Sequence, residues 1–195
     1  MKLNPEQFNE FVKNRRSVFP SQFDSTKKIP DEIVKQILVN ATWAPNHGKS
    51  EPWFFQVYTG AGLQTFADLQ SKSYKEEAGD KFKVDKYLKL QQTPLLASHI
   101  ISIGMKRTTT KQIPEIEDIE AVACAVQNIY LSVAAYGLGG YWTTGGVTYL
   151  EKAKYHFGLG EQDKLLGFFY LAYVAIPSPA AIRSPIEEKV AWVRK

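Results

Sequence analysis

Residues 117–140 read EDIEAVACAVQNIYLSVAAYGLGG and contain the longest helical signal of the chain. Apolar side chains fall on more than one face of this helix, at Ile119, Val122, Val126, Ile129, Leu131 and Val133. A helix that is apolar on several faces is buried on several sides, and Gly137 supplies a C-terminal stop. We therefore predict a central helix over residues 117–136 that is buried nearly all round. Such a helix needs more cover than so small a chain provides, and a second subunit could supply it.

Shorter elements flank this helix. One helix is predicted from Pro5 to about Asn14, because Asn4 can cap it and proline fits its first turn. Another begins at Pro30 and ends near Ala44, since the following proline disfavours helical geometry at that residue. Further helices are predicted over residues 62–77 and, as an exposed helix or a mobile segment, 79–92; strands over 53–58, 95–105 and 165–175; and a surface loop over 106–116. This mixture, without internal repeats or linker composition, predicts one α+β domain over residues 1–195.

The composition narrows the class of partner. The formal net charge is +4 and the pI is about 9.0, but the lysines of residues 72–89 are interleaved with acidic residues. Such a pattern is typical of a solvated helical face, so nucleic acid is not predicted as a partner. A mildly positive chain does suit an anionic small molecule. Aromatic residues make up 13% of the chain, which fits either a bulky core or the lining of a flat ligand or subunit interface.

Cysteine and histidine give little evidence of chemistry. The single cysteine, Cys124, sits in an apolar run and is predicted to be an inert core thiol. His47, His99 and His156 are far apart and match no metal-ligand spacing, so no metal is predicted. The first residues carry no apolar signal region and no stretch approaches the length of a membrane span. A cytoplasmic protein without membrane contact is therefore expected.

Several enzyme classes lack their motifs. In Gly137-Leu138-Gly139-Gly140 and Gly158-Leu159-Gly160, the position of the third glycine of a dinucleotide fingerprint holds Trp142 and Asp163. Neither run follows a strand and opens a helix, which that fingerprint requires. The chain also has no Gly-x-Ser-x-Gly elbow and no P-loop, so the sequence supports neither a hydrolase nor a kinase.

Three short elements remain as candidates for a ligand site. Arg15-Arg16-Ser17 suits a phosphomonoester, since guanidinium groups bind its oxygens in pairs, although adjacent arginines are usually surface charge. Residues 44–53, bracketed by Pro45 and Pro52, form a rigid polar loop at a ligand edge or a tight connection. In residues 139–146, glycines let backbone N–H groups approach a ligand, or simply form a flexible turn.

The order of these elements resembles the nitroreductase family. Arg-Arg-Ser comes first, an Ala-Pro…Pro-Trp loop follows near residue 50, and Ala125-Val126-Gln127-Asn128 precedes the helix end at Gly-Leu-Gly-Gly. The resemblance covers about residues 10–185 and is closest to small, minimal members. These carry Ala-Pro-Asp-His where this chain has Ala-Pro-Asn-His. The resemblance implies a nitroreductase-like α+β fold, with a mostly antiparallel central sheet surrounded by helices, in an obligate homodimer with FMN at the interface.

The resemblance also assigns residues to the flavin. Arg15, Arg16 and Ser17 would hold the phosphate and ribityl end, and Arg183 is a candidate second phosphate ligand. The edge of the flavin ring would be contacted by a loop of the second subunit and lined by a glycine-rich stretch of the first. The cofactor-binding set is Arg15, Arg16, Ser17, Trp43, Pro45, Asn46, His47, Lys49, Trp142, Thr143, Thr144, Gly145 and Arg183. Lys49 and Glu51 depart from the family, which often has Asn and Gln there.

The implied reaction is a two-step hydride transfer. NADH or NADPH would reduce the flavin at N5, and a small-molecule oxidant such as a nitroaromatic or a quinone would then accept the hydride. The chemistry resides on the flavin, so no side chain is predicted as a catalytic nucleophile. Two alternatives keep the fold: a flavin-dependent enone reductase or dehydrogenase, and a flavin-binding, storage or interaction protein without turnover.

Overall fold

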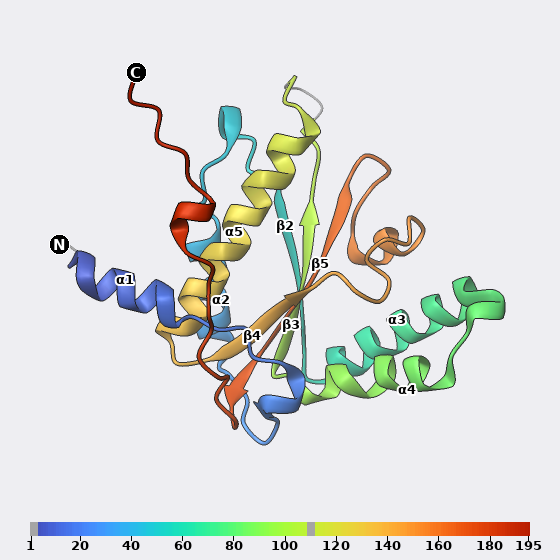
Figure 1. The fold of residues 1–195 in the computed structure, drawn as a ribbon. Coiled ribbons are helices and arrows are strands. Elements are labelled where there is room, and N and C mark those ends of the chain that lie inside the picture. The colour runs from blue at the N-terminus through green and yellow to red at the C-terminus, as the bar shows by residue number, and fades with distance from the viewer. Residues whose placement is uncertain (1–3, 109–111) are drawn as a thin grey trace.

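A five-stranded antiparallel sheet forms the centre of the chain in the computed structural model, which describes residues 4–108 and 112–195 (Figure 1). The strands are β1 (Phe23–Asp24), β2 (Trp53–Thr59), β3 (His99–Met105), β4 (Gly139–Thr143) and β5 (Lys164–Val174). β5 is the strand to which most of the others attach, since it pairs with β1, β3 and β4. β2 completes the sheet by pairing with β3.

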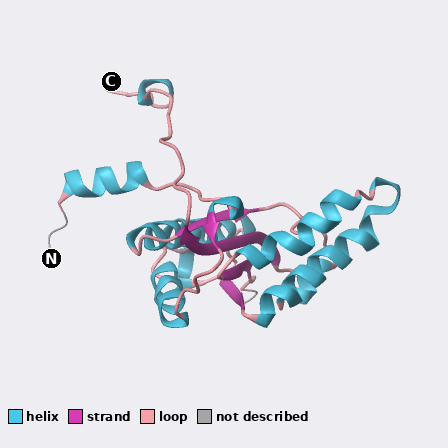
Figure 2. Cartoon of the chain, turned by 90° about the horizontal axis from the view of Figure 1, so that it is seen from below, coloured by secondary structure: helices cyan, strands magenta, loops and turns pink. Residues whose placement is uncertain are grey.

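The helices lie on both sides of this sheet and project from it. They are α1 (Pro5–Asn14), α2 (Asp31–Ala41), α3 (Ala61–Ala78), α4 (Val84–Gln92) and α5 (Glu115–Ala135). α2 and α5 pack against each other and against one face of the sheet. α3 and α4 form a helical hairpin that projects on one side, whereas α1 and the tail after β5 project on the other (Figure 2).

Alternation along β5 divides the interior into two cores. Phe169 and Leu171 pack with α2 and α5, while Phe168 and Tyr170 pack with α3 and the turns after β4. Because successive side chains of a strand point to opposite faces, one apolar strand fills both cores. This two-sided burial explains why β5 is apolar at nearly every position.

Most of the predicted elements are confirmed, with shifted ends. α2 ends three residues before Ala44, because tight turns from Asn40 to Trp43 and from Ala41 to Ala44 follow it. The strand predicted from residue 95 begins at His99, since Thr93–Leu96 forms a 3-10 helix. α5 begins two residues early, after Pro114. Of the two alternatives for residues 79–92, the helical one is confirmed by α4. The described parts of the 106–116 loop lack regular structure up to Pro114, and residues 109–111 lie outside the description.

Within a single chain, two expectations about α5 are not met. The helix is buried only where it meets the sheet and α2, and its outer stripe at Glu120, Cys124 and Gln127 is exposed. Cys124 is therefore not a core thiol. The apolar run around it is buried on one side only, because one sheet and one neighbouring helix cannot surround a helix. The α5 outer stripe thus stays open in a single chain.

The predicted glycine-rich turn contains a strand. Residues 139–143 form β4, in which a Cβ on Gly139 would come within 2.9 Å of the Cβ of Val18. A Cβ on Gly140 would collide with the carbonyl oxygen of Tyr170 and approach the Phe169 ring to 2.5 Å. Glycine is present here because neighbouring chain segments come very close, and its usual association with turns hides the strand from the sequence.

None of the helices in the described ranges is both long and apolar enough to cross a bilayer.

Gly140→Ala is expected to lower the free energy of unfolding by about 2 kcal/mol or more, because a backbone carbonyl cannot move aside as a side chain can. Denaturant titration of the variant against the unmodified chain measures this loss. Gly62→Ala is the matched control, since its Cβ would meet only Tyr58 at 3.9 Å. There we expect no loss, and a gain of up to about 1 kcal/mol from helix propensity. Equal stability of the two variants would refute the close approach of β4 to β5.

Candidate functional site

Arg15 and Ser17 follow α1 directly and turn toward α5. The Arg15 guanidinium lies 4.7 Å from the centre of the Tyr130 ring, and Ser17 Oγ lies 3.4 Å from the Tyr130 hydroxyl. That hydroxyl accepts a hydrogen bond of 2.7 Å from the backbone N–H of Trp142. Tyr130 therefore joins the Arg-Arg-Ser segment to β4, which the sequence separates by more than a hundred residues.

One nitrogen of Arg15 is buried without a partner. Among the described residues, its Nη1 makes no hydrogen bond. An unpaired buried donor on a charged group is costly, roughly 1–3 kcal/mol or more. Such a donor points to an acceptor that is not part of the chain, and an oxyanion is the partner that a guanidinium binds best.

Arg183 lies at the same cavity as Arg15. This cavity, of about 630 Å³, is formed by α1, α5 and the C-terminal tail, and its lining residues are Phe8, Asn9, Val12, Lys13, Arg15, Gln127, Ala181 and Arg183. The set contains three cationic side chains and no acidic one, although Lys13 pairs with Glu10 at 3.2 Å. We call it the arginine cavity, and its charge favours an anionic ligand.

Arg16 makes different contacts. Its guanidinium donates to the carbonyl oxygens of Lys13 at 2.6 Å, Arg15 at 2.8 Å and Pro179 at 3.2 Å. Arg16 thus fastens the C-terminal tail to the end of α1. Contact between Arg16 and a phosphate stays a prediction.

The Arg-Arg-Ser segment and β4 form one continuous wall. The backbone N–H of Val18 donates to the carbonyl of Gly140 at 3.0 Å, and the rings of Phe19 and Tyr141 lie 5.2 Å apart. Trp142 is fixed by a 2.8 Å bond from its indole nitrogen to the carbonyl of Leu166. The predicted residues of β4 are therefore held in place on a rigid strand rather than on a flexible turn.

A second cavity, of about 340 Å³, lies between this wall and the α3–α4 hairpin. Its lining residues are Gln70, Lys86, Lys89, Leu90, Thr93, Tyr141, Thr143, Gly145, Gly146, Phe168 and Tyr170. It contains two of the predicted residues, Thr143 and Gly145, whereas Thr144 between them is not among its lining residues. We call it the hairpin cavity. From the sequence, its lysines were predicted to lie on a solvated helical face. The three-residue spacing of Lys86 and Lys89, which puts both on one side of a helix, is the sequence feature that could have grouped them at one site.

Burial changes the acidity of the two tyrosines in the hairpin cavity. Loss of hydration raises the pKa of Tyr141, and it raises the pKa of Tyr170 further because Tyr170 is more deeply buried. A phenol is protonated at neutral pH even without such a shift, so both remain able to donate hydrogen bonds.

The loop of residues 43–51 lies apart from both cavities. Trp43 is 82% exposed, and His47 Nδ1 pairs with Glu117 Oε2 at 2.5 Å, which fastens the loop to the start of α5. Asn46 Oδ1 accepts from the backbone N–H of Glu51 at 3.1 Å.

Lys49 and Glu51 adopt left-handed backbone, with φ of +54° and +46°, which costs non-glycine residues energy. Pro45 is exposed as well. Trp43, Pro45, Asn46, His47 and Lys49 thus form a second group that lines neither cavity.

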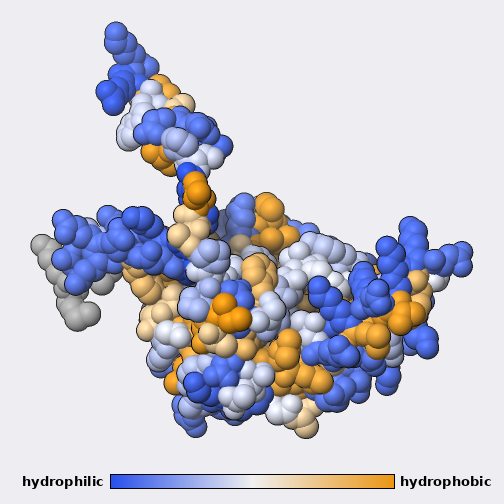
Figure 3. Space-filling view, turned by 60° about the horizontal axis from the view of Figure 1, so that its bottom comes forward, coloured by the Kyte–Doolittle hydropathy of each residue, from blue (hydrophilic) through white to orange (hydrophobic). Residues whose placement is uncertain are grey.

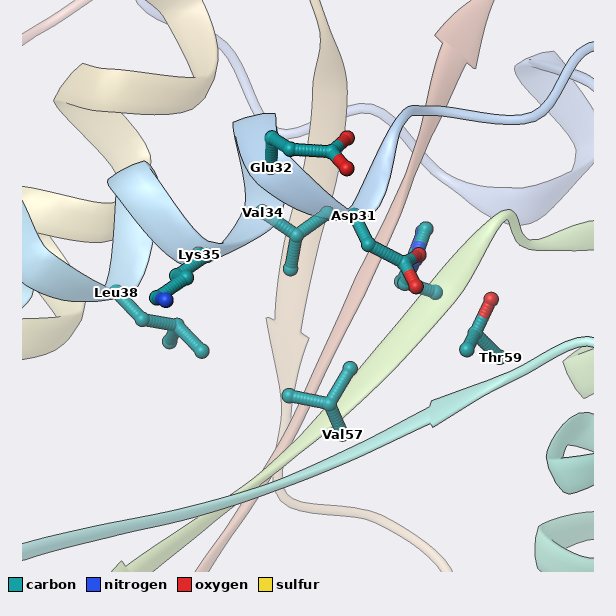
Figure 4. A pocket seen from close by; sticks show the side chains of 8 residues that line it. Asp31, Glu32, Val34, Lys35, Leu38, Val57 and Thr59 are labelled. Atoms are coloured by element: carbon teal, nitrogen blue, oxygen red, sulfur yellow. The ribbon is translucent and has the colours of Figure 1, made fainter.

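A third cavity of about 510 Å³ contains none of the predicted residues (Figure 4). Val34, Leu38 and Val57 give it apolar sides, between α2 and the edge strand β2. His99 at its rim is buried and pairs with Asp31 Oδ1 at 2.9 Å. Within the described ranges, no cluster of His, Cys, Asp or Glu side chains could hold a metal ion.

Comparison with known proteins agrees with this architecture. The model of the nitroreductase family matches residues 12–173. The chain belongs to the nitroreductase family. Its relatives include the Escherichia coli (strain K12) protein named "Putative NAD(P)H nitroreductase YdjA", which is 29% identical over 154 residues, or 79% of this chain and 82% of that protein.

Solved structures show the same fold. The nitroreductase-like family protein of Bacillus cereus superposes with a TM-score of 0.85 at 28% identity, over 100% of both chains. The FMN-dependent nitroreductase NfnB of Mycobacterium smegmatis, solved in complex with NADPH, gives a TM-score of 0.73 over 97% of this chain and 99% of that one. At 17% identity, this similarity shows a shared fold and nothing more. The predicted nitroreductase-like α+β fold, with its antiparallel sheet, is confirmed.

Proposed function

We propose that this nitroreductase-family chain is an FMN-dependent oxidoreductase, which passes hydride from NADH or NADPH to a nitroaromatic, a quinone or a similar planar acceptor. The unpaired, buried Nη1 of Arg15 is the observation that supports it most directly. Arg15 also lines a cavity together with Arg183 and Lys13, and this charge suits a phosphomonoester. The names of the relatives point to the same donor and cofactor.

The proposal assigns residues to each part of FMN. Arg15, Ser17 and Arg183 would hold the phosphate, and the wall formed by β4 would carry the ribityl chain and the ring, with Arg16 securing the tail beside them. FMN, when bound, supplies the redox chemistry by accepting and giving up hydride at N5. The Thr143 hydroxyl and the neutral phenols can hydrogen-bond to acceptor atoms of a ligand, while the backbone N–H of Gly145 donates to Thr143 Oγ1 at 3.2 Å. No protein nucleophile is needed, so the chain binds, orients and excludes water.

A homodimer would complete the site. The α5 outer stripe is uncovered, and the segment that projects from the body carries apolar surface (Figure 3). Trp43 is 82% exposed, Ile182 93% and Trp192 79%. Large apolar side chains in such numbers indicate a surface that another chain covers. A second copy would also bring its 43–47 loop to the ring, since within one chain that loop lines neither cavity. A cytoplasmic location stays a prediction from the sequence.

The absorption spectrum of the purified protein tests cofactor and donor together. We expect flavin bands near those of free FMN that bleach anaerobically with NADH, NADPH or both and return when a quinone or nitroaromatic is added. A colourless protein that gains no flavin on incubation with FMN would overturn the proposal. Bound flavin that neither nucleotide bleaches would indicate a storage or interaction protein instead. Reoxidation by enones alone would indicate an enone reductase.

Arg15→Ala is expected to weaken FMN binding by about 1.5–3 kcal/mol, because it removes a charge-assisted contact to the phosphate. Arg16→Ala should weaken it less, since that guanidinium is already bonded to three carbonyl oxygens. Fluorescence titration of the apoprotein with FMN measures both, and riboflavin, which lacks the phosphate, is the ligand control. Arg15→Ala should leave riboflavin affinity unchanged. An equal loss for both ligands would place the phosphate elsewhere.

Trp43→Ala is expected to raise the dissociation constant of the dimer at least tenfold, because an exposed tryptophan is the kind of residue that dominates an interface. Sedimentation velocity over a range of concentrations measures this. Leu88→Ala, at an exposed apolar position on α4, is the control and should leave association unchanged. An unmodified protein that stays monomeric while binding FMN tightly would contradict the shared site.

A further inference from the structure

The hairpin cavity contains two positively charged side chains to which the proposed function assigns no role. Lys86 and Lys89 reach it from one side of α4, and no acidic side chain is among its lining residues. The opposite side is β4, whose Thr143 and following Gly145 are predicted to line the flavin. The cavity therefore joins the predicted ring site to a cationic helix face.

The polar groups of this cavity include two phenols. Tyr141 and Tyr170 are protonated at neutral pH, as tyrosines ordinarily are, and burial raises the pKa of each further. Gln70, which also lines the cavity, is fixed by a 2.7 Å bond from its Nε2 to the carbonyl oxygen of Leu90. Donors and cations together match a planar edge that is rich in oxygen and nitrogen acceptors and gains negative charge.

The two lysines are not equivalent. The Lys86 ammonium lies 4.4 Å from the centre of the Tyr74 ring, a cation–π contact that holds it against α3. Lys89 has neither a carboxylate nor an aromatic partner in the described part of the chain, and its side chain is exposed at the rim of the cavity. Lys89 is thus the cation whose side chain can approach a ligand bound in the cavity.

We propose that the pyrimidine edge of FMN faces the hairpin cavity and that Lys89 is its counter-charge. The inference rests on the proposed function and deepens it. When NADH or NADPH delivers hydride to N5, both electrons of the broken C–H bond enter the ring, and one negative charge remains on N1 and the C2 oxygen. An ammonium group near these atoms stabilises the reduced flavin more than the oxidised one. Lys89, rather than Lys49, then raises the reduction potential.

The test measures that differential stabilisation directly. In Lys89→Met holoenzyme we expect reduced FMN to lose about tenfold in affinity relative to oxidised FMN, which lowers the two-electron midpoint potential by about 30 mV. Spectroelectrochemical titration with mediators measures the potential. Sulfite, which also places negative charge on N1 and the C2 oxygen when it adds to N5, provides a second readout without any nucleotide. Its dissociation constant should rise about tenfold.

Two further variants make the result specific. Lys89→Arg keeps the charge and should retain the potential and the sulfite affinity of the unmodified protein. Lys72→Met removes one exposed charge from the same hairpin without touching the cavity, and it should also change neither value. An equal shift in Lys72→Met would assign the effect to net charge and overturn the role of Lys89.

Failure of this inference is distinct from failure of the proposed function. If unmodified protein binds FMN that nucleotides bleach, while Lys89→Met has an unchanged potential and unchanged sulfite affinity, only the role of Lys89 is refuted. A change confined to the KM of the electron acceptor would refute it as well, since that result places Lys89 at the acceptor. If unmodified protein binds no FMN, the proposed function itself fails.

Discussion

The close pairing of β4 with β5 is the constraint on which the rest of the molecule depends. β4 can lie against β5 only because Gly139 and Gly140 have no side chain there, and because Gly167 of β5 adopts a φ of +120° beside Thr143. This strand fixes Trp142 against the Tyr130 hydroxyl, and with it the Arg-Arg-Ser segment. It also forms one side of the hairpin cavity. Both parts of the proposed flavin site therefore rely on a single strand with little tolerance for added volume.

The sequence predicts the elements whose signals are local. Capping and proline geometry locate α1 and α2, apolar runs locate β3 and β5, and the long apolar pattern locates α5. β4 escapes prediction because its glycines are selected by contacts with Val18 and Tyr170, which are distant in the sequence. Cys124 is misplaced for a related reason: an apolar neighbourhood in sequence does not reveal which side of a helix meets the sheet. Local chemistry predicts elements, but the packing partners decide exposure.

The candidate site follows the same division. Arg15 and Arg183 could be paired only by resemblance, and the structure places them on one cavity. Lys86 and Lys89 were assigned to solvent because acidic residues alternate with them in sequence. Most of those acidic residues lie outside α4, and Lys86 and Lys89 line a cavity that has no carboxylate among its lining residues. The 43–47 loop lines neither cavity, because it is fastened to the start of α5 through His47 and Glu117. Its predicted role can only be fulfilled across a subunit boundary.

The arrangement of charge suggests how one small fold separates binding from reactivity. A phosphate keeps its charge throughout the reaction, so in the proposed site the arginine cavity would stabilise oxidised and reduced flavin equally and would set affinity alone. The ring gains its charge only on reduction, so a cation at the hairpin cavity acts on the difference between the two states. The first group is held by the end of α1 and the tail, the second by a projecting hairpin. Under this proposal, substitutions on α4 would alter the potential while β4 and its glycines, which would hold the cofactor, stay unchanged.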